Sequence, residues 1–340
     1  MGLDLPHQVG LIGFFGWGNF GDELFFQLWT NQLSRWTPFR ANDLLAKPYF
    51  SRPATEVAAS ADALIIGGGD LIRTEAISPL YWNRAWTDRP LVISGIGVAE
   101  ESGQRRPDVV PRLRQFFQNA NILSLSARDA RSQEWIESKL HPPLPVRLVP
   151  DLAFGIETSA RRRRDSDDEI LVPTIGLVLN RDCSETDVKL AEELTVMHLA
   201  GNIYLRILVL ATGQQLSTER ALLLALNLSV SFEVIDSVDH MIGAIADLDL
   251  LYSAKFHGLV VAARHGVPSF SLRRTSKAIS LAESCHLVQI APDYSWSLQD
   301  ALQSINDSEA GRAQVAGWVS SAQAELLHVQ GVIDEIQRCR

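Results

Sequence analysis

The chain has 340 residues, of which 46% are hydrophobic and 21% are charged, and its formal net charge at pH 7 is −9. This length favours two domains over a single hydrophobic core, and the composition is typical of a globular protein. The negative charge argues against a nucleic-acid-binding protein, because contacts with phosphate groups require a basic face.

The first half of the chain alternates between strand-like and helix-like patterns. Helical spacing of apolar residues is seen at 22–36 and 108–119, and a further helix is expected to begin near residue 129. Short strands that alternate with helices of this length indicate a parallel sheet with right-handed crossovers. Strands are predicted for the apolar runs 9–14, 63–66, 91–94 and 122–125.

A highly charged run at 161–169 interrupts this pattern and is expected to be an exposed linker. The pattern then restarts, and one or two helices are expected from about residue 308 to the C-terminus. Strands of this second half are predicted at 175–179, 205–210, 232–235, 248–252 and 269–272.

We therefore expect an α/β protein of two Rossmann-like, doubly wound domains that face a cleft. The expected parts are an N-terminal domain on the acceptor side at 1–164, a C-terminal domain on the donor side at 165–310, and C-terminal helices at 311–340.

A glycine-rich turn, residues 13–23, follows the first predicted strand and opens a helix. Its glycine spacing matches the dinucleotide-binding fingerprint, but Asp22 and Glu23 place negative charge where a pyrophosphate needs the positive end of a helix. Two interpretations remain. Either Asn19 and the loop amides hold a substrate, or the turn only needs glycines with positive φ and is capped by Asp22. We favour the first, because the turn is expected to face the cleft.

Three further glycines, Gly67, Gly68 and Gly69, are predicted to end the second strand, and Asp70 follows them. Glycines allow the backbone to approach a ligand closely, and the Asp70 carboxylate would serve sugar hydroxyls or acid–base chemistry. A tight turn in which Asp70 caps the next helix is an equally good interpretation.

A histidine and two lysines follow the strands predicted in the second half. His257 lies at a strand end beside Lys255, and Gly258 leaves room for a ligand, which favours acid–base or anion-binding chemistry over a structural role. Past the next strand, the basic loop 273–277 ends in Lys277. This loop is expected either to bind a carboxylate or phosphate group or to be solvated.

An arginine occupies the corresponding place in the first half. Arg128 follows a predicted strand and precedes a helix that begins near Ala130. It is expected either to reach into the cleft or to form a surface salt bridge with Asp129.

Cys183, Cys285 and Cys339 are widely spaced and form no metal-binding or disulfide pattern, so we expect reduced thiols. The histidines lack partners at metal-ligand spacing, and we expect no metal site. No apolar run approaches the roughly 20 residues that span a bilayer, and the N-terminus lacks the residue order of a signal peptide. We therefore expect a cytoplasmic protein with at most peripheral contact with the inner face of the membrane.

Taken in order, these motifs resemble those of the polysaccharide pyruvyltransferase family. The matching segments span residues 9–277 and are Gly13-x-x-Gly16-x-Gly18-Asn19-x-Gly21-Asp22-Glu23, Gly67-Gly68-Gly69, Ser126-x-Arg128-Asp129-x-x-Ser132, Pro150-Asp151 and Ser253-x-Lys255-x-His257-Gly258. The resemblance implies a GT-B-like fold. It also implies transfer of an enolpyruvyl-derived group from phosphoenolpyruvate to two hydroxyls of a sugar, giving a cyclic pyruvate ketal and phosphate. Members act in bacterial cell-surface polysaccharide pathways, often on lipid-linked saccharides.

The resemblance also implies roles for particular residues. The family's essential arginine and histidine correspond to Arg128 and His257, and a later lysine corresponds to Lys277. Lys255 stands where the family motif usually has arginine; it keeps the charge but lacks the fork of a guanidinium. The expected catalytic residues are His257, Arg128 and Asp70. The expected donor-binding residues are Ser253, Lys255, His257, Gly258, Lys277 and Arg128. The expected acceptor-binding residues are Gly18, Asn19, Asp22, Gly68 and Gly69.

Two rival functions remain open, and so does the role of Lys255. A glycosyltransferase of the same fold would use the lysines to hold the diphosphate of a nucleotide-sugar, and a non-catalytic relative would only bind saccharide. Lys255 either contacts the donor directly or packs its stem at the strand end with its head in solvent. The pyruvyltransferase reaction requires neither a metal nor an organic cofactor, so none is expected beyond the donor substrate itself.

Overall fold

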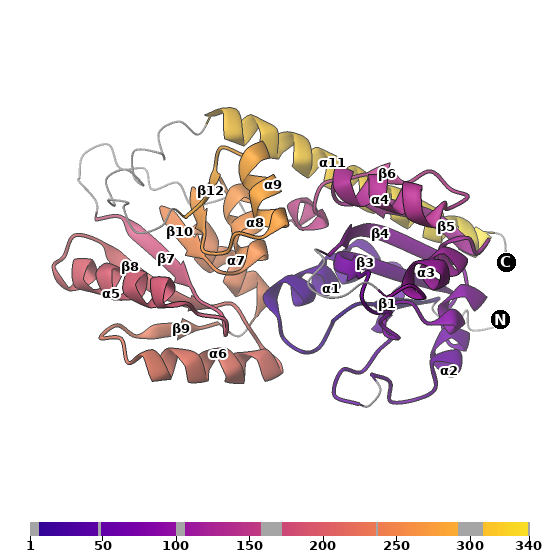
Figure 1. Ribbon diagram of the computed structural model, residues 1–340, viewed down its shortest axis with the longest axis horizontal. Coiled ribbons are helices and arrows are strands. Elements are labelled where there is room, and N and C mark those ends of the chain that lie inside the picture. Colours follow the sequence, from indigo (N-terminus) through magenta and orange to yellow (C-terminus); the bar gives the residue numbers. More distant parts are fainter. Residues whose placement is uncertain are drawn as a thin grey trace. The chain divides into compact units, whose positions relative to one another are not determined.

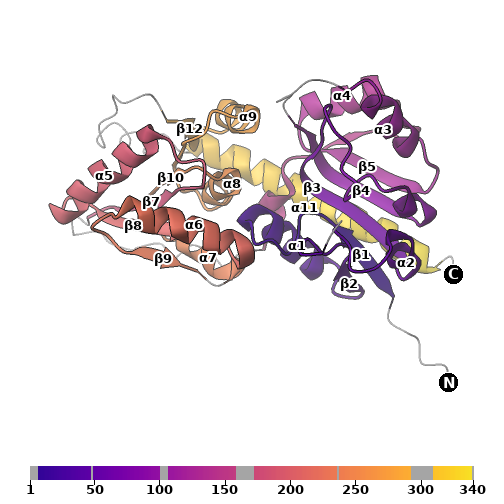
Figure 2. The ribbon, with the colours of Figure 1, turned by 60° about the horizontal axis from the view of Figure 1, so that its bottom comes forward.

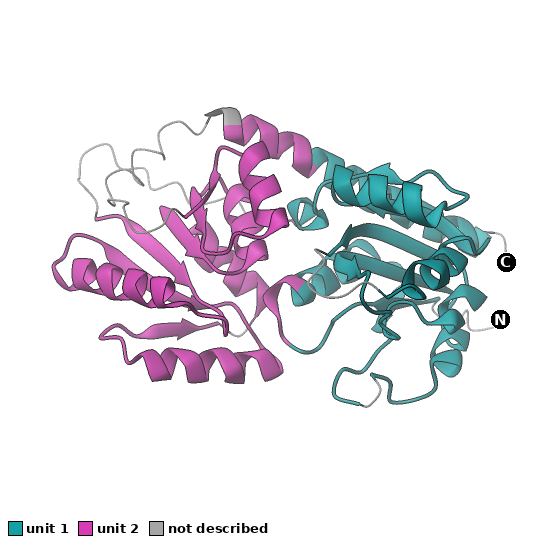
Figure 3. Ribbon diagram, in the orientation of Figure 1, with its two compact units in different colours: residues 1–17, 22–156, 320–340 teal, residues 18–21, 157–319 magenta. Residues whose placement is uncertain are grey.

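The computed structural model describes residues 7–46, 49–99, 106–157, 172–235, 237–291 and 309–338. The chain forms two compact units (Figure 3). Unit 1 comprises residues 1–17, 22–156 and 320–340, and unit 2 comprises residues 18–21 and 157–319. The linker expected at 161–169, and with it the domain boundary expected after residue 164, lies outside the described residues.

Unit 1 is built on a parallel sheet of six strands in the order β2-β1-β3-β4-β5-β6 (Figure 1). Its strands are β1 Gln8–Ile12, β2 Thr37–Arg40, β3 Ala63–Ile72, β4 Leu91–Val98, β5 Ile122–Ala127 and β6 Arg147–Leu148. Its helices are α1 Phe20–Gln32, α2 Ala54–Ala59, η1 Arg84–Asp88, α3 Val109–Phe117, α4 Ala130–Leu140, η2 Leu152–Gly155 and the second half of α11 Glu309–Arg338.

Helices cover both faces of this sheet (Figure 2). Helices α2, α3 and α4 lie on one face, where Leu113 and Ile136 enter the main hydrophobic core. Helices α1 and α11 lie on the other face. The side chain of Glu325 on α11 is buried there and accepts hydrogen bonds from the hydroxyls of Ser94 (2.8 Å) and Ser126 (2.7 Å). The terminal segment therefore forms a single long helix whose second half is anchored to unit 1 by a polar contact as well as by apolar packing.

Unit 2 contains a second parallel sheet of six strands, in the order β12-β11-β10-β7-β8-β9. Its strands are β7 Thr174–Val178, β8 Tyr204–Val209, β9 Phe232–Val234, β10 Leu250–Ser253, β11 Ser269–Ser271 and β12 Val288–Ile290. Its helices are α5 Glu185–Leu199, α6 Gly213–Leu226, α7 Val238–Ala246, α8 Phe256–Arg264, α9 Ser276–Ser284 and the first half of α11. The strand order reverses between β7 and β10, and ligands of doubly wound sheets bind at the carboxyl ends of the strands at such a point.

These two parallel, doubly wound sheets confirm the predicted fold class. Three local predictions are wrong. Strand β4 does not end at Ser94 but continues to Val98. Strand β3 does not end at Gly67 but continues to Ile72, so Asp70 pairs with Gly97 of β4 and caps no helix. Helix α1 begins at Phe20, so Asp22 lies in its first turn rather than before it.

The glycines of β3 let helix α1 approach the sheet. Gly68 has a φ of +81°, and a Cβ there would lie 2.5 Å from the ring of Phe25. A Cβ at Gly67 would lie 2.9 Å from the indole nitrogen of Trp29. Two large aromatic residues of α1 therefore pack directly on the backbone of β3.

We expect Gly68→Ala to lower the free energy of unfolding by about 2–4 kcal/mol, because an added methyl group overpacks the Phe25 contact and a side chain is strained at positive φ. Urea unfolding of the full chain would measure this loss. Gly317→Ala is the matched control, since Gly317 lies in helix α11 and a Cβ there meets nothing within 4 Å. The control should leave stability unchanged or raise it by up to about 1 kcal/mol. Equal effects of the two substitutions would contradict the packing role of Gly68.

Candidate functional site

The turn that follows β10 presents His257. Strand β10 ends at Ser253 and helix α8 begins at Phe256, so His257 lies in the first turn of α8. The Ser253 hydroxyl donates to the carbonyl oxygen of Lys255 (2.8 Å) and accepts from the Lys255 amide (3.1 Å). A Cβ at Gly258 would lie 2.7 Å from the Ser253 oxygen. Ser253 and Gly258 therefore shape the turn on which His257 stands, and a direct contact of either with a donor stays a prediction.

The glycine turn from the beginning of the chain lies against this histidine. The Thr212 amide donates to the carbonyl oxygen of Gly18 (2.8 Å), and Asn19 forms an antiparallel bridge with Ala211. Gly18 has a φ of +98°, and a side chain there would overlap the backbone of Thr212. A Cβ at Gly21 would overlap the imidazole ring of His257. Within unit 2 the structure thus brings together two motifs that lie more than 200 positions apart in the sequence.

Lys277 lies near the same histidine. The Thr275 hydroxyl caps helix α9 by accepting from the Ala278 amide (3.3 Å), which places Lys277 in the first turn of that helix. The Lys277 ammonium lies 5.1 Å from the centroid of the Phe256 ring, and the rings of Phe256 and His257 are 5.4 Å apart in an edge-to-face arrangement. An ammonium at this distance is attracted by the face of the ring. The Lys277 ammonium and the His257 imidazole therefore both lie beside the Phe256 ring.

Lys255 points away from solvent. Its ammonium lies 2.6 Å from a carboxylate oxygen of Glu219 on α6 and donates to the carbonyl oxygen of Leu210 at the end of β8. The side chains of Lys255 and Glu219 are only 9% and 2% exposed. The alternative in which the head of Lys255 lies in solvent is therefore wrong, while a contact of Lys255 with the donor stays a prediction.

Arg273 is likewise held inside unit 2. Its guanidinium lies 2.8 Å from the carboxylate of Asp187 and donates to the side-chain oxygen of Asn180 (2.9 Å). The interpretation of loop 273–277 as solvated is therefore wrong for Arg273.

In unit 1 the predicted arginine is surrounded by carboxylates. Arg128 follows β5, and its side chain, only 5% exposed, forms an ion pair with Asp70. Asp129 and Asp151 each place a carboxylate oxygen 3.7 Å from the guanidinium. Asp129 also caps α4 by accepting from the Ser132 amide (2.7 Å). The alternative, an ion pair with Asp129, is present, but the Arg128 side chain is buried rather than at the surface, and Asp70 is its nearer partner.

The remaining acceptor-side residues have identifiable local roles. Burial, and to a lesser extent the negative charge of Asp22, raises the pKa of Tyr81. Gly69 has a φ of +94° in the irregular middle of β3. Contacts of Asp22, Gly68 and Gly69 with an acceptor stay predictions.

Two glutamates of structural importance are absent from the sequence-based prediction of the site. Glu23 accepts a hydrogen bond from the Gly16 amide (2.6 Å) and thereby closes the glycine turn, and it also lies 3.2 Å from Arg40. The position of Glu23 at the end of the glycine motif is the feature of the sequence that could have indicated this role. Glu219, the partner of Lys255, stands in the polar helical run Ser217–Arg220, and nothing in that run distinguishes it from an exposed helix residue.

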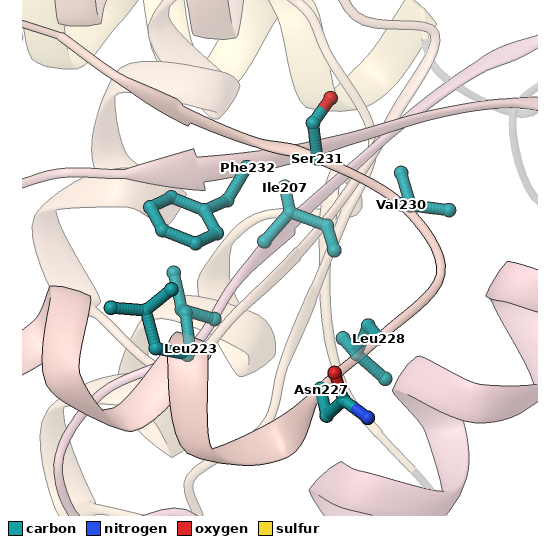
Figure 4. Close-up of a pocket in the computed structure, with 8 residues that line it drawn as sticks. Ile207, Leu223, Asn227, Leu228, Val230, Ser231 and Phe232 are labelled. Carbon is teal, nitrogen blue, oxygen red and sulfur yellow. The ribbon is translucent and has the colours of Figure 1, made fainter.

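A separate pocket of about 310 Å³ lies in unit 2, among β8, the end of α6 and the loop before β9 (Figure 4). Most of the lining residues are aliphatic, and Asn227 and Ser231 are the two with polar side chains. The lining loop precedes β9, whereas His257 follows the carboxyl end of β10. The pocket therefore contains none of the predicted site residues.

Within the described ranges, no group of three or more His, Cys, Asp or Glu residues is placed to hold a metal ion. Cys183 and Cys285 form no disulfide, and burial raises the pKa of each thiol; Cys339 lies outside the described residues. None of the helices described is long and apolar enough to span a bilayer.

Comparison with known proteins identifies the family. The model of the polysaccharide pyruvyl transferase family matches residues 19–276, which is most of the chain and includes residues 19–23 of the glycine turn and the whole His257 turn. The chain therefore belongs to the polysaccharide pyruvyl transferase family and is a transferase of polysaccharide biosynthesis. No curated protein matches the sequence.

Solved structures share the fold at low sequence identity. MnaA from S. aureus, solved with UDP, is 10% identical with a TM-score of 0.56, and the alignment covers 96% of this chain and 95% of that chain. Sucrose-phosphate synthase from Thermosynechococcus elongatus is 12% identical with a TM-score of 0.52, covering 98% and 100%. The spinosyn forosaminyltransferase SpnP is 10% identical with a TM-score of 0.52, covering 97% and 99%. This likeness shows the fold, which is of the GT-B type.

The close approach of Gly21 to His257 can be tested by a double-mutant cycle. We expect Gly21→Ala to lower the free energy of unfolding by about 1–3 kcal/mol, because the added methyl group displaces the imidazole ring. In a His257→Ala background the same substitution should cost almost nothing, since the methyl group then finds space. Urea unfolding of the four proteins measures the coupling. An equal cost in both backgrounds would show that Gly21 and His257 are not in contact.

Proposed function

We propose that this protein transfers a pyruvyl group from phosphoenolpyruvate to two hydroxyls of a sugar in a cell-surface polysaccharide or its lipid-linked precursor. The product is a cyclic pyruvate ketal, and phosphate is released. Membership of the family supports pyruvyl transfer in general. The observation that carries the assignment to this donor is the grouping of His257 with the Lys277 ammonium around Phe256, which offers positive charge and a titratable group to a small anion. The same membership disfavours the nucleotide-sugar and purely saccharide-binding alternatives.

The reaction requires a definite set of proton movements. The methylene carbon of phosphoenolpyruvate gains a proton and becomes a methyl group, and its neighbouring carbon becomes an oxocarbenium-like centre. One sugar hydroxyl adds to that carbon and loses its proton, and the bond to phosphate breaks. The second hydroxyl adds in turn and loses its proton, and phosphate takes up the remaining proton. Positioned acid–base groups and fixed positive charge accelerate such steps.

The residues of this chain suit those steps. We assign acid–base work to His257, with stabilisation of the leaving phosphate as its alternative role. Lys277 and Arg128 would bind the donor's carboxylate and phosphate groups. Asp70 would take part in proton transfer, and the acceptor sugar would meet Asn19 and the neighbouring glycine turn. No metal or organic cofactor enters this scheme, and the proposed location is the cytoplasm, at or near the inner face of the membrane.

We expect His257→Ala to reduce transfer by about 10²–10⁴-fold while the protein stays folded, because a positioned acid–base group contributes this much. The measurement is phosphate release from phosphoenolpyruvate that depends on added saccharide acceptor, with circular dichroism as the check on folding. His257→Gln is a second variant of similar size. If both variants are well folded and retain near-wild-type turnover, His257 has no catalytic role.

The Asp70–Arg128 ion pair generates a prediction about the donor. If Arg128 binds the donor, Asp70 competes with it for the same guanidinium, so Asp70→Asn should tighten binding of phosphoenolpyruvate by about three- to tenfold while lowering turnover. Isothermal titration calorimetry measures the affinity. Glu75→Gln is the control, because it removes a unit 1 carboxylate that pairs with Arg73 instead. Equal or weaker donor binding by Asp70→Asn would remove Arg128 from the donor site.

A further inference from the structure

Two neighbouring strands of unit 2, β10 and β11, are each followed by a turn with the same hydrogen-bond pattern. Ser253 and Ser271 are register partners at the ends of β10 and β11, and each hydroxyl donates to the carbonyl oxygen two residues further on (2.8 Å in both). Each of those residues is a cation, Lys255 or Arg273. Each cation is paired with a buried carboxylate, at 2.6 Å for Lys255 and 2.8 Å for Arg273. Two ion pairs of the same kind therefore lie side by side at the carboxyl ends of β10 and β11.

The two pairs hold different parts of unit 2. Asp187, the partner of Arg273, belongs to the capping box at the start of α5, and Arg273 also contacts Asn180 after β7. This pair secures the β7–α5 connection. Glu219, the partner of Lys255, comes from α6 and accepts a further hydrogen bond from Gln215 (2.8 Å).

The Lys255 ammonium extends its contacts toward the glycine turn. Besides Glu219 it holds the carbonyl oxygen of Leu210, and the next residue, Ala211, forms the bridge with Asn19. Thr212 then donates to the carbonyl oxygen of Gly18.

The chain of contacts closes on the histidine. Gly21 lies against His257, which is only two positions from Lys255. The Glu219–Lys255 pair, the loop after β8, residues 18–21 of the glycine turn and His257 therefore form one closed ring of contacts, all within unit 2.

We propose that Glu219 is a positioning residue, which acts through Lys255 to fix the loop after β8, and with it the glycine turn and His257. Lys255 then serves as a buried support whose charge is matched by Glu219, and the donor is bound by other cations. The kinetic consequence of this proposal rests on the proposed function, whereas its structural consequence does not. A single misplaced group can cost a large factor in rate even when the fold is intact.

Hydrogen exchange of the full-length protein tests the structural part. Glu219→Gln should speed amide exchange about tenfold or more in peptides that cover residues 18–21 and 210–213, because the support of that loop is lost. Asp187→Asn is the matched control, since it breaks the corresponding ion pair with Arg273 after the neighbouring strand β11. It should speed exchange near residues 180–188 and leave the glycine turn unchanged. An unchanged glycine turn in Glu219→Gln, or equal changes there in both variants, would overturn the proposal.

A second variant keeps the test decisive if Glu219→Gln fails to fold. Glu219→Leu combined with Lys255→Met removes both buried charges at once, a change that proteins often tolerate. This double variant should fold and still show faster exchange at residues 18–21. Full protection there would overturn the proposal.

Steady-state kinetics with phosphoenolpyruvate and a saccharide acceptor test the functional part. Glu219→Gln and Lys255→Met should each lower kcat by about 10- to 100-fold, with KM for phosphoenolpyruvate changed less than about twofold. The pair of substitutions should cost no more than the worse single one, since both act through one contact.

A different outcome identifies Lys255 as a donor ligand and overturns the proposal. In that case Lys255→Met raises KM for phosphoenolpyruvate, and Glu219→Gln lowers it by releasing the lysine charge. If the wild-type protein neither binds nor turns over phosphoenolpyruvate, the proposed function fails, and the exchange experiment still decides whether Glu219 positions the turn.

Discussion

The candidate site of unit 2 depends on the close approach of the backbone at Gly18 and Gly21 to Thr212 and His257, which leaves no room for a side chain at either glycine. Gly18 and Gly21 lie so close to Thr212 and His257 that a methyl group at either glycine would overlap its neighbour. Only glycine permits such contact, and only glycine adopts the positive φ of Gly18 without strain. This approach allows the hydrogen bond from the Thr212 amide to Gly18 and the bridge between Asn19 and Ala211. It also places Gly21 against the His257 ring. The glycine spacing that resembles a dinucleotide fingerprint is thus explained by close packing between segments of this chain.

Buried charge imposes the second constraint. Arg128, Lys255 and Arg273 are each largely buried, and each has a carboxylate within 3 Å. A buried cation without such a partner would be very costly, so every cation near a strand end needs an acid from another element. In a chain with a net charge of −9 these acids are abundant. The number of lysines and arginines in a motif therefore does not show by itself how much positive charge an anionic substrate meets, because buried carboxylates balance part of it.

The sequence predicts the parallel sheets well, because strands such as β1 and β10 are short, mostly buried and largely apolar runs. It misses β2, whose four residues include Pro38 at the edge of the sheet, and it ends β3 too early. Consecutive glycines normally indicate a turn, yet here they continue a strand because the aromatic residues of α1 pack on them. The His257 turn is recognisable from its local motif. The role of Glu219 is not, since its contact with Lys255 joins positions 36 residues apart and the helix around it has an ordinary polar pattern.

The turns after β10 and β11 offer different sets of acceptors to Lys255 and Arg273. Around Arg273 there are four acceptors: the Asp187 carboxylate, the Asn180 side chain and the carbonyl oxygens of Asp182 and Leu272. A guanidinium with five donors in a planar fork suits such a set. The Lys255 ammonium contacts a carboxylate oxygen of Glu219 and the carbonyl oxygen of Leu210. A compact ammonium suits that geometry. The lysine at position 255 therefore fits the carboxylate and carbonyl oxygens that it meets in this chain.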